Sequence, residues 1–223
     1  MDLSTIEFYQ QTAPETAAKY RAVKTSESQR QFQEIFPSGS RILDVGSGSG
    51  RDLAVLLSLG FDAYGLEPSS SMQAEALRFY PELAGRLFRF GLPLSDELDL
   101  GGPFDGILCS AVLMHVPEEE LFNSAFTLKR LLRQGGRLWI SVPLNRSGLD
   151  SECRDAAGRL FKPLHPEYLL LLFERLGFKL LRRSEDADRM GRSEIRWASF
   201  VLELGGTEGR PLDRIEGVLN QDR

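Results

Sequence analysis

The chain has 223 residues, of which 42% are hydrophobic and 26% are charged, as in an ordinary globular protein. This length predicts one α/β domain with some appended structure, large enough to bury a core without disulfide or metal staples. A formal net charge of −5 argues against binding to a nucleic-acid backbone. The longest candidate apolar run, Ala111–Val116, is far shorter than the roughly 20 residues that span a bilayer, so no membrane partner is expected.

The sequence also argues against export and metal binding. Its first residues, Met1–Glu7, are polar and acidic, unlike the basic and then apolar start of a signal peptide, and they predict a cytoplasmic protein. Cys109 and Cys153 have neither the spacing of metal ligands nor a disulfide framework around them. No metal site is therefore expected.

Residues 1–40 are predicted to form a helical lid over a binding site. This segment is polar and rich in Gln, Glu and Ala, and its aromatic residues are spaced as buried anchors. Tyr9 and Tyr20 are candidate substrate contacts on the inner side of the lid. Pro37–Ser40 interrupts the helical pattern and ends the segment.

Residues 41–205 are predicted to form the main domain, because short apolar runs alternate there with helical segments. This alternation is typical of a parallel sheet with helices on both faces. Residues 206–223 begin an amphipathic pattern that is either a C-terminal helix or the start of a downstream segment. The expected strands are 41–45, 63–66, 87–90, 107–110, 138–142, 178–181 and 197–204, and the expected helices are 52–59, 70–79, 117–132 and 167–176.

The first expected strand leads into a glycine-rich turn, in which Asp44 is followed by Gly46, Gly48 and Gly50. Glycines at a strand-to-helix turn let a ligand approach the backbone closely. A dinucleotide site uses G-x-G-x-x-G, but here the third glycine comes one residue early and Arg51 stands in its place. A carboxylate at position 44 is unfavourable beside a pyrophosphate and suits a ligand with an ammonium group. The pattern favours a cationic ligand over NAD, with a plain turn as the alternative.

A second acid, Glu67, follows the strand expected at 63–66 and comes 23 residues after Asp44. An acid at this position of a βαβ unit accepts hydrogen bonds from both hydroxyls of a ribose. The alternative is that Glu67 interacts with the dipole of the next helix. The two roles are compatible, and the combination with Asp44 favours a ribose-containing cofactor.

Four motifs follow one another in the middle of the chain. They are the glycine turn, the acid Glu67, Phe104–Ile107 leading to Met114–Pro117, and Leu131–Leu138. In this order they resemble the class I methyltransferases that use S-adenosylmethionine (SAM), particularly the broad small-molecule group. The resemblance implies a Rossmann-like, doubly wound sheet of seven strands with the last strand antiparallel. It also implies that the product cofactor is S-adenosylhomocysteine (SAH).

The resemblance further implies which residues contact the cofactor. The family often has an acid after its third strand that holds the adenine amino group, whereas this chain has Gly91 and Leu92, whose backbone groups are expected to replace it. Ser47 stands where the family often has Cys or Thr. The predicted cofactor contacts are Asp44, Gly46, Ser47, Gly48, Gly50, Glu67, Pro68, Met72, Gly91, Leu92, Ser110 and Ala111.

Two interpretations of His115 stay open. It follows the fourth strand, where an acceptor would enter, and it is either a general base or a residue that packs against the cofactor. The candidate substrate residues Arg154, Arg159 and Arg192 also allow two interpretations. They hold an anionic acceptor, or they form a salt-bridged surface with neighbouring acids.

The predicted function is the transfer of a methyl group from SAM to a small-molecule acceptor. One alternative is a catalytically silent SAM-binding or scaffolding module of a larger protein. A nicotinamide-dependent oxidoreductase is the other, disfavoured by the spacing of the glycine turn. The sequence has no Asn-Pro-Pro-Tyr motif, which argues against methylation of exocyclic amines on DNA bases or of glutamine side chains. It leaves the oligomeric state open.

Overall fold

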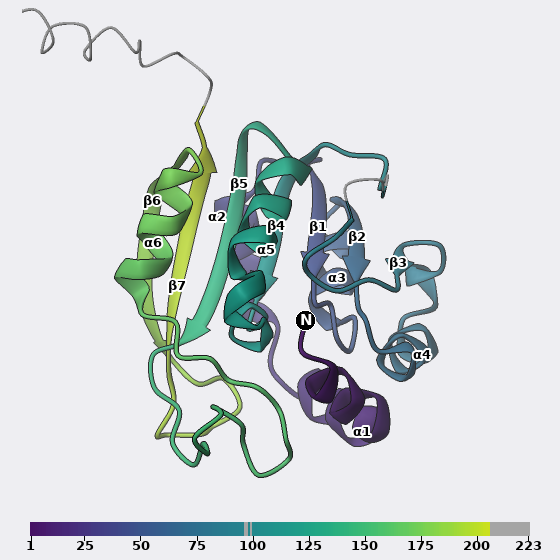
Figure 1. Ribbon diagram of the computed structural model, residues 1–223. Coiled ribbons are helices and arrows are strands. Elements are labelled where there is room, and N and C mark those ends of the chain that lie inside the picture. The colour runs from purple at the N-terminus through teal and green to yellow at the C-terminus, as the bar shows by residue number, and fades with distance from the viewer. Residues whose placement is uncertain (96–97, 99, 206–223) are drawn as a thin grey trace, which may run out of the picture.

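The computed structural model describes residues 1–95, 98 and 100–205, and within them a seven-stranded sheet forms the centre (Figure 1). The strands are β1 (Arg41–Val45), β2 (Asp62–Leu66), β3 (Leu87–Phe88), β4 (Phe104–Ser110), β5 (Leu132–Pro143), β6 (Phe178–Ala187) and β7 (Arg196–Leu204). Their order is β3-β2-β1-β4-β5-β7-β6. The pairs among β1 to β5 are parallel, whereas β7 runs antiparallel to β5 and β6. The predicted Rossmann-like, seven-stranded architecture is confirmed.

Helices cover both faces of this sheet. They are α1 (Leu3–Arg21), α2 (Ser26–Ile35), α3 (Arg51–Ser58), α4 (Ser70–Phe79), α5 (Glu118–Leu131) and α6 (Pro166–Arg175), with short 3-10 helices η1 (Pro81–Leu83) and η2 (Leu113–His115). In Figure 1, α5 and α6 lie over one face, and α2 and α3 lie behind the sheet over the other. No helix in the described part of the chain is long and apolar enough to cross a membrane.

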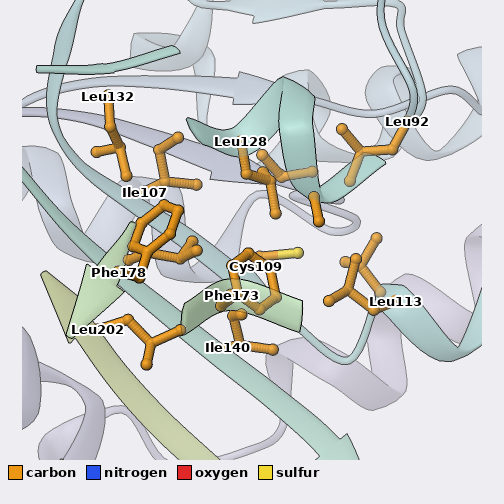
Figure 2. Close-up of a cluster of buried hydrophobic side chains, with 14 of the residues drawn as sticks. Leu92, Ile107, Cys109, Leu113, Leu128, Leu132, Ile140, Phe173, Phe178 and Leu202 are labelled. Carbon is orange, nitrogen blue, oxygen red and sulfur yellow. The ribbon is translucent and has the colours of Figure 1, made fainter. Parts of the chain in front are cut away.

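The alternation of side chains along the central strands fills a core on each face. Ile107 and Cys109 of β4 lie in the core beneath α5 and α6, where Figure 2 shows the Cys109 thiol close to Phe173. Leu108, between them, belongs to the opposite core with Phe32 of α2. Strands covered on both faces need apolar residues at consecutive positions, which is why these strands read as continuous hydrophobic runs.

β5 and β6 exceed their predicted bounds by the most residues. β5 begins at Leu132 rather than at residue 138, because Leu132 already pairs with Phe104 before the pairing register shifts. Gly135, with φ of 74°, therefore lies inside the irregular start of the strand. β6 continues to Ala187 rather than ending at residue 181, because backbone pairing with β7 compensates for its polar sequence.

The N-terminal helices, predicted together as a lid, have different surroundings. α1 packs on α4, with Ala13 and Ala17 against Met72. α2 instead packs against the sheet through Phe32 and Ile35. The predicted division at residues 40 and 205 stays a prediction, and the predicted tail, 206–223, lies outside the described residues.

β1 lies where the direction of strand addition reverses, with β2 and β3 on one side and β4 and β5 on the other. Open α/β sheets bind ligands beyond the carboxyl ends of their strands at such a point. Figure 1 shows α1, the loop 144–165 after β5, and the connection 188–195 between β6 and β7 at this end of the sheet. The fold therefore gathers the N-terminal helix and two late loops around the carboxyl end of β1.

Candidate active site

A cavity of about 270 Å³ lies at the carboxyl ends of the parallel strands. Its walls come from α1, the glycine-rich turn, η2, the loop after β5, and the connection between β6 and β7. The structure thus brings together residues that are far apart in the sequence. Among the residues predicted as site residues, those that line it are Tyr9, Tyr20, Asp44, Gly46, Ser47, Gly48, Glu67, Pro68, Met72, Ser110, Ala111, His115, Arg159 and Arg192.

The glycine-rich turn is held against the end of β2. The backbone N–H groups of Gly46 and Ser47 donate to the Leu66 carbonyl at 2.8 and 2.9 Å. Gly46, Gly48 and Gly50 have φ of 71°, 54° and 74°, in the left-handed region that favours glycine. Gly50 lies outside the cavity lining, and a Cβ there would come within 2.6 Å of a buried leucine side chain. Close packing of α3 therefore explains Gly50 without a ligand contact.

Glu67 directly follows β2 and is only 6% exposed. Its two carboxylate oxygens accept hydrogen bonds from the backbone N–H groups of Gly48 at 3.0 Å and Ser69 at 2.8 Å. Burial raises the pKa of Glu67 from 4.5 to about 7, although both of these hydrogen bonds act to lower it. Each oxygen keeps a second lone pair, so the carboxylate can also accept from a pair of ligand hydroxyls.

Asp44, at the carboxyl end of β1, is a second buried acid in the cavity wall. Burial and then the nearby charge of Asp52 raise the pKa of Asp44 well above its usual range, and Arg51 partly opposes them. Arg51 is itself paired with Asp52 at 2.7 Å. A cationic ligand would lower the pKa of both Asp44 and Glu67, because an opposite charge favours the ionised carboxylate.

The floor of the cavity lies just beyond β4. Ala111 has φ of 58°, a conformation that costs a non-glycine residue about 1–3 kcal/mol and is often found at functional sites. Its backbone N–H donates to both the carbonyl and the hydroxyl of Ser141, each at 3.1 Å. The Ser110 and Ser141 hydroxyls are hydrogen-bonded at 2.9 Å. These contacts hold the end of β4 to β5 in the strained conformation.

His115, in η2, is buried in the wall between two aromatic rings. Its ring centroid lies 4.8 Å from that of Phe161 and 6.2 Å from that of Tyr9. Nδ1 donates to the Leu160 carbonyl at 2.5 Å, which leaves Nε2 without the proton in the neutral ring. Burial lowers the pKa of His115 from 6.5 to about 4, so the imidazole is neutral at pH 7.

Gly91 and Leu92, expected to contact adenine, do not line this cavity. The Met1 side chain lies against Gly91, where a Cβ would come within 2.8 Å of it. The Leu92 carbonyl accepts a hydrogen bond from the Met1 amino group, and Leu92 itself is buried in the core. Met1 is the residue from this corner that reaches the cavity. A contact that spans 91 positions leaves no signal in the local sequence.

Arg154, expected as a substrate contact, also lies outside the lining. Its guanidinium forms a two-point ion pair with Asp2, with distances of 2.9 and 3.0 Å. This pair holds the loop after β5 to the beginning of α1. The structure therefore gives Arg154 a structural partner instead of a position facing the cavity.

Several lining residues were not predicted from the sequence. Trp139 and Ser141 are two residues apart on β5 and therefore point to the same face of the sheet, toward the cavity. This spacing of two along a predicted strand is the sequence signal that could have identified them. Within the described residues, the buried Trp139 Nε1 has no hydrogen-bond partner. Arg146 and Phe161 come from the loop after β5, where no periodicity marks them.

Residues 17–183, more than half of the chain, match the family model of the methyltransferase domain. The chain belongs to this methyltransferase family. The predicted membership in the SAM-dependent methyltransferases is thereby confirmed, and SAM is the cofactor of the family.

Curated relatives of this methyltransferase match over part of their length. Protein-L-isoaspartate O-methyltransferase from Methylorubrum populi is 38% identical over 111 residues, which cover 47% of this chain and 45% of the relative. The protein of the same name from Chlorobaculum tepidum is 32% identical over 116 residues, covering 49% and 47%. The chain therefore spans about half the length of these relatives.

Solved structures match over most of their length. The 1,6-didemethyltoxoflavin-N1-methyltransferase of Burkholderia thailandensis, with bound 1,6-didemethyltoxoflavin and SAH, superposes with a TM-score of 0.74. It is 17% identical, and the match covers 91% of this chain and 88% of that one. The cyclase SpnF has a TM-score of 0.65 at 17% identity, covering 89% and 94%. At such identities the similarity shows a shared fold.

The residues of the cavity fit SAM. Glycine at position 48 has no side chain, and a Cβ there would lie 3.8 Å from the end of the Met72 side chain. The absence of this atom leaves space in the cavity wall for a ligand. Asp44 and Glu67 offer carboxylates to an ammonium group and to ribose hydroxyls. Ser47 also lines the cavity, and its buried hydroxyl, which has no partner within the described residues, lies against Gly65 of β2.

Proposed function

We propose that this methyltransferase transfers a methyl group from SAM to a small-molecule acceptor. The observation that carries the proposal is one continuous cavity with chemically different ends. Asp44 and Glu67 lie at the end formed by β1 and β2, and His115 and Phe161 lie at the end formed by η2 and the loop after β5. Bound SAM supplies an activated methyl group. The end of the cavity beside His115 and Phe161 is where the methyl acceptor would bind.

In this proposal the protein acts mainly by positioning. Asp44 binds an ammonium group and Glu67 binds a pair of ribose hydroxyls, each through charge-assisted hydrogen bonds. Ser110 and Ala111 form the floor between the two ends of the cavity. Holding two reactants in line supplies a large part of the rate enhancement in a displacement reaction. α1 and the loop after β5 exclude water around them.

We propose an orienting role for His115. The Leu160 carbonyl accepts the Nδ1–H of His115, so the proton is absent from Nε2. The Nε2 lone pair can therefore accept a hydrogen bond from the molecule that is methylated. A pKa of about 4 makes this imidazole a weak base at neutral pH. His115 therefore holds the acceptor, or its hydrogen-bonding neighbour, more readily than it removes a proton.

The names of the curated relatives raise a protein acceptor as the second candidate, since they methylate L-isoaspartate in proteins by name. The lining at the acceptor end favours a small molecule. Aromatic side chains from three separate elements, Tyr9, Phe161 and Trp197, line the cavity, and they suit a compact ring better than an extended peptide.

The test is methyl transfer from isotopically labelled SAM, offered in parallel to a protein-free metabolite extract and to an isoaspartyl peptide. We expect label in the small-molecule fraction, with Glu67→Ala as the background control. Label on the peptide alone would favour the protein acceptor. If SAH binds and neither pool is labelled, the chain is a silent SAM-binding module and the proposal is wrong.

A further inference from the structure

We propose that the acceptor carries a negative charge next to an aromatic ring, and that Arg146 and Arg159 bind that charge. This inference rests on the proposed function, because it assigns the acceptor end of the same cavity. The two arginines come from the loop after β5, and both guanidinium groups lie against the ring of Phe161.

The first argument is that these two arginines share one carboxylate. Asp155 accepts from Arg159 at 2.6 and 3.0 Å and pairs with Arg146 at 3.4 Å. Arg146 and Arg159 line the cavity, whereas Asp155 does not, so the carboxylate lies behind the guanidinium groups. This corner therefore has two positive charges for one negative charge. The Nε of Arg146 is buried and has no hydrogen-bond partner in the described part of the chain.

The other charged groups at the acceptor end carry no positive excess. The connection between β6 and β7 brings Asp186, Asp188, Arg189 and Arg192 to the wall. Arg192 pairs with Asp188 at 2.6 Å, and this acid also accepts from the indole of a neighbouring tryptophan. Arg189 pairs with Glu27 of α2 at 3.7 Å and donates to two other polar side chains of that helix. The positive excess is thus confined to the corner beside Phe161.

The second argument is the shape of this corner. The guanidinium carbons of Arg146 and Arg159 lie 4.6 and 5.1 Å from the centre of the Phe161 ring. Phe161 meets His115 edge-on, and His115 meets Tyr9 in the same way, which forms a row of rings along the wall. A planar ligand can pack on this row while its acidic group meets the guanidinium forks, which match a carboxylate in two-point geometry.

The experiment compares two probes of the same shape, 2-naphthoate and uncharged 2-naphthamide, titrated calorimetrically into wild-type protein saturated with SAH. We expect naphthoate to bind about tenfold more tightly, the size of a charge-assisted hydrogen bond. Arg159→Met and Arg146→Met each remove the excess charge and should bring the two affinities to within about threefold. Arg78→Met, on the exposed surface of α4, should retain the full preference.

Asp155→Asn tests the same inference by removing the negative charge beside the two arginines instead of a positive one. The Asp155 Oδ1 accepts from the N–H groups of Ala157 and Arg159, and asparagine keeps this acceptor. The substitution should therefore leave the loop intact and raise the preference for naphthoate above the wild-type value.

Equal binding of the two probes by wild-type protein, binding of neither, or an undiminished preference in both arginine variants would overturn the inference. If circular dichroism shows one arginine variant to be unfolded, the other and Asp155→Asn decide. Failure of SAH itself to bind wild-type protein would contradict the proposed function instead, which keeps the two failures distinct.

Discussion

Among single residues, Glu67 is expected to make cofactor binding depend on pH. Burial raises its pKa to about 7, and hydroxyl donors favour its ionised form. We expect the affinity for SAH, measured by calorimetry, to increase between about pH 6 and about pH 8. Glu67→Gln should bind SAH at least about tenfold more weakly at the higher pH and show a smaller increase, the remainder coming from Asp44.

The same carboxyl has the opposite effect on folding. Its folded-state pKa lies above the unfolded value of 4.5, so its contribution to stability is present below 4.5 and is lost as pH rises through about 7. Burial of Glu67 therefore lowers the free energy of unfolding at neutral pH, and the same buried position lets the carboxylate contact the cofactor. Equal SAH affinities of Glu67→Gln and wild-type protein at about pH 8 would remove Glu67 from the site.

His115 is expected to stabilise the neutral-pH fold. The unfolded imidazole takes up a proton below about 6.5 and the folded one near 4, because the folded ring is buried. The stability that this neutral ring contributes is present above 6.5 and is lost as pH falls through 4, an amount of about 3 kcal/mol. In urea unfolding, the stability difference between wild-type protein and His115→Asn should shrink between pH 7 and pH 4.5. A constant difference would contradict the buried, neutral state.

Once an acceptor is known, His115→Asn also tests the orienting role. We expect turnover to fall by less than about 100-fold, with the shape of the pH–rate profile unchanged, because a ring with a pKa of about 4 does not titrate near neutrality. The measurement is turnover against pH at saturating SAM. A larger loss with unchanged SAH affinity, and loss of an acidic limb from the profile, would identify His115 as the base.

At the scale of elements, hydrogen bonds and an ion pair in the first turn of α1 hold this helix against the site. The Asp2 side chain caps the helix by accepting from the Thr5 N–H at 2.8 Å and also pairs with Arg154. The Asp2 N–H donates to the His115 carbonyl at 3.0 Å, and the Leu160 N–H donates to the Thr5 hydroxyl at 2.9 Å. These bonds join α1, η2 and the loop after β5 at one point.

Asp2→Ala should therefore loosen α1 and the loop after β5 together. It removes a helix cap worth about 1 kcal/mol and leaves Arg154 without its carboxylate. We expect faster amide hydrogen exchange in α1 and in residues 150–161, and weaker SAH binding. Asp2→Asn is the matched control, because asparagine caps well but carries no charge, and it should lie between wild type and Asp2→Ala. Faster exchange in α1 alone would show that the loop is held independently.

Helix α4 illustrates how far local sequence signals reach. Its predicted bounds, 70–79, agree with the structure. The capping residue is Ser69, whose hydroxyl accepts from the Met72 N–H at 3.2 Å. The Gln73 side chain donates to the Glu67 carbonyl at 2.9 Å. The helix was predictable from its own residues, whereas its side-chain partners depended on where β2 ends.

For the whole molecule, cofactor binding is expected to stabilise the fold, because the site exists only when β1, β2 and α1 are assembled. A ligand at 100 times its Kd adds about 2.7 kcal/mol to the free energy of unfolding. We expect SAH to raise the Tm in a concentration-dependent manner and NAD at the same concentration to leave it unchanged. A Tm that rises with NAD and not with SAH would contradict the spacing argument from the glycine turn.

The sequence by itself determined the architecture, and it marked Asp44, Glu67 and the glycine-rich turn, which the structure brings to one cavity. Glycines at φ values that other residues avoid, an acid at the end of β2, and alternating strands and helices are features of short stretches, and short-range backbone preferences encode them. Only the tertiary structure decided the acceptor end and the corner that was expected to hold adenine. It paired Asp2 with Arg154 across 152 positions and placed Met1 against Gly91. Such contacts depend on how separate elements pack. An arginine in a loop has several acids within reach, so which acid it pairs with is determined only when the whole chain has folded.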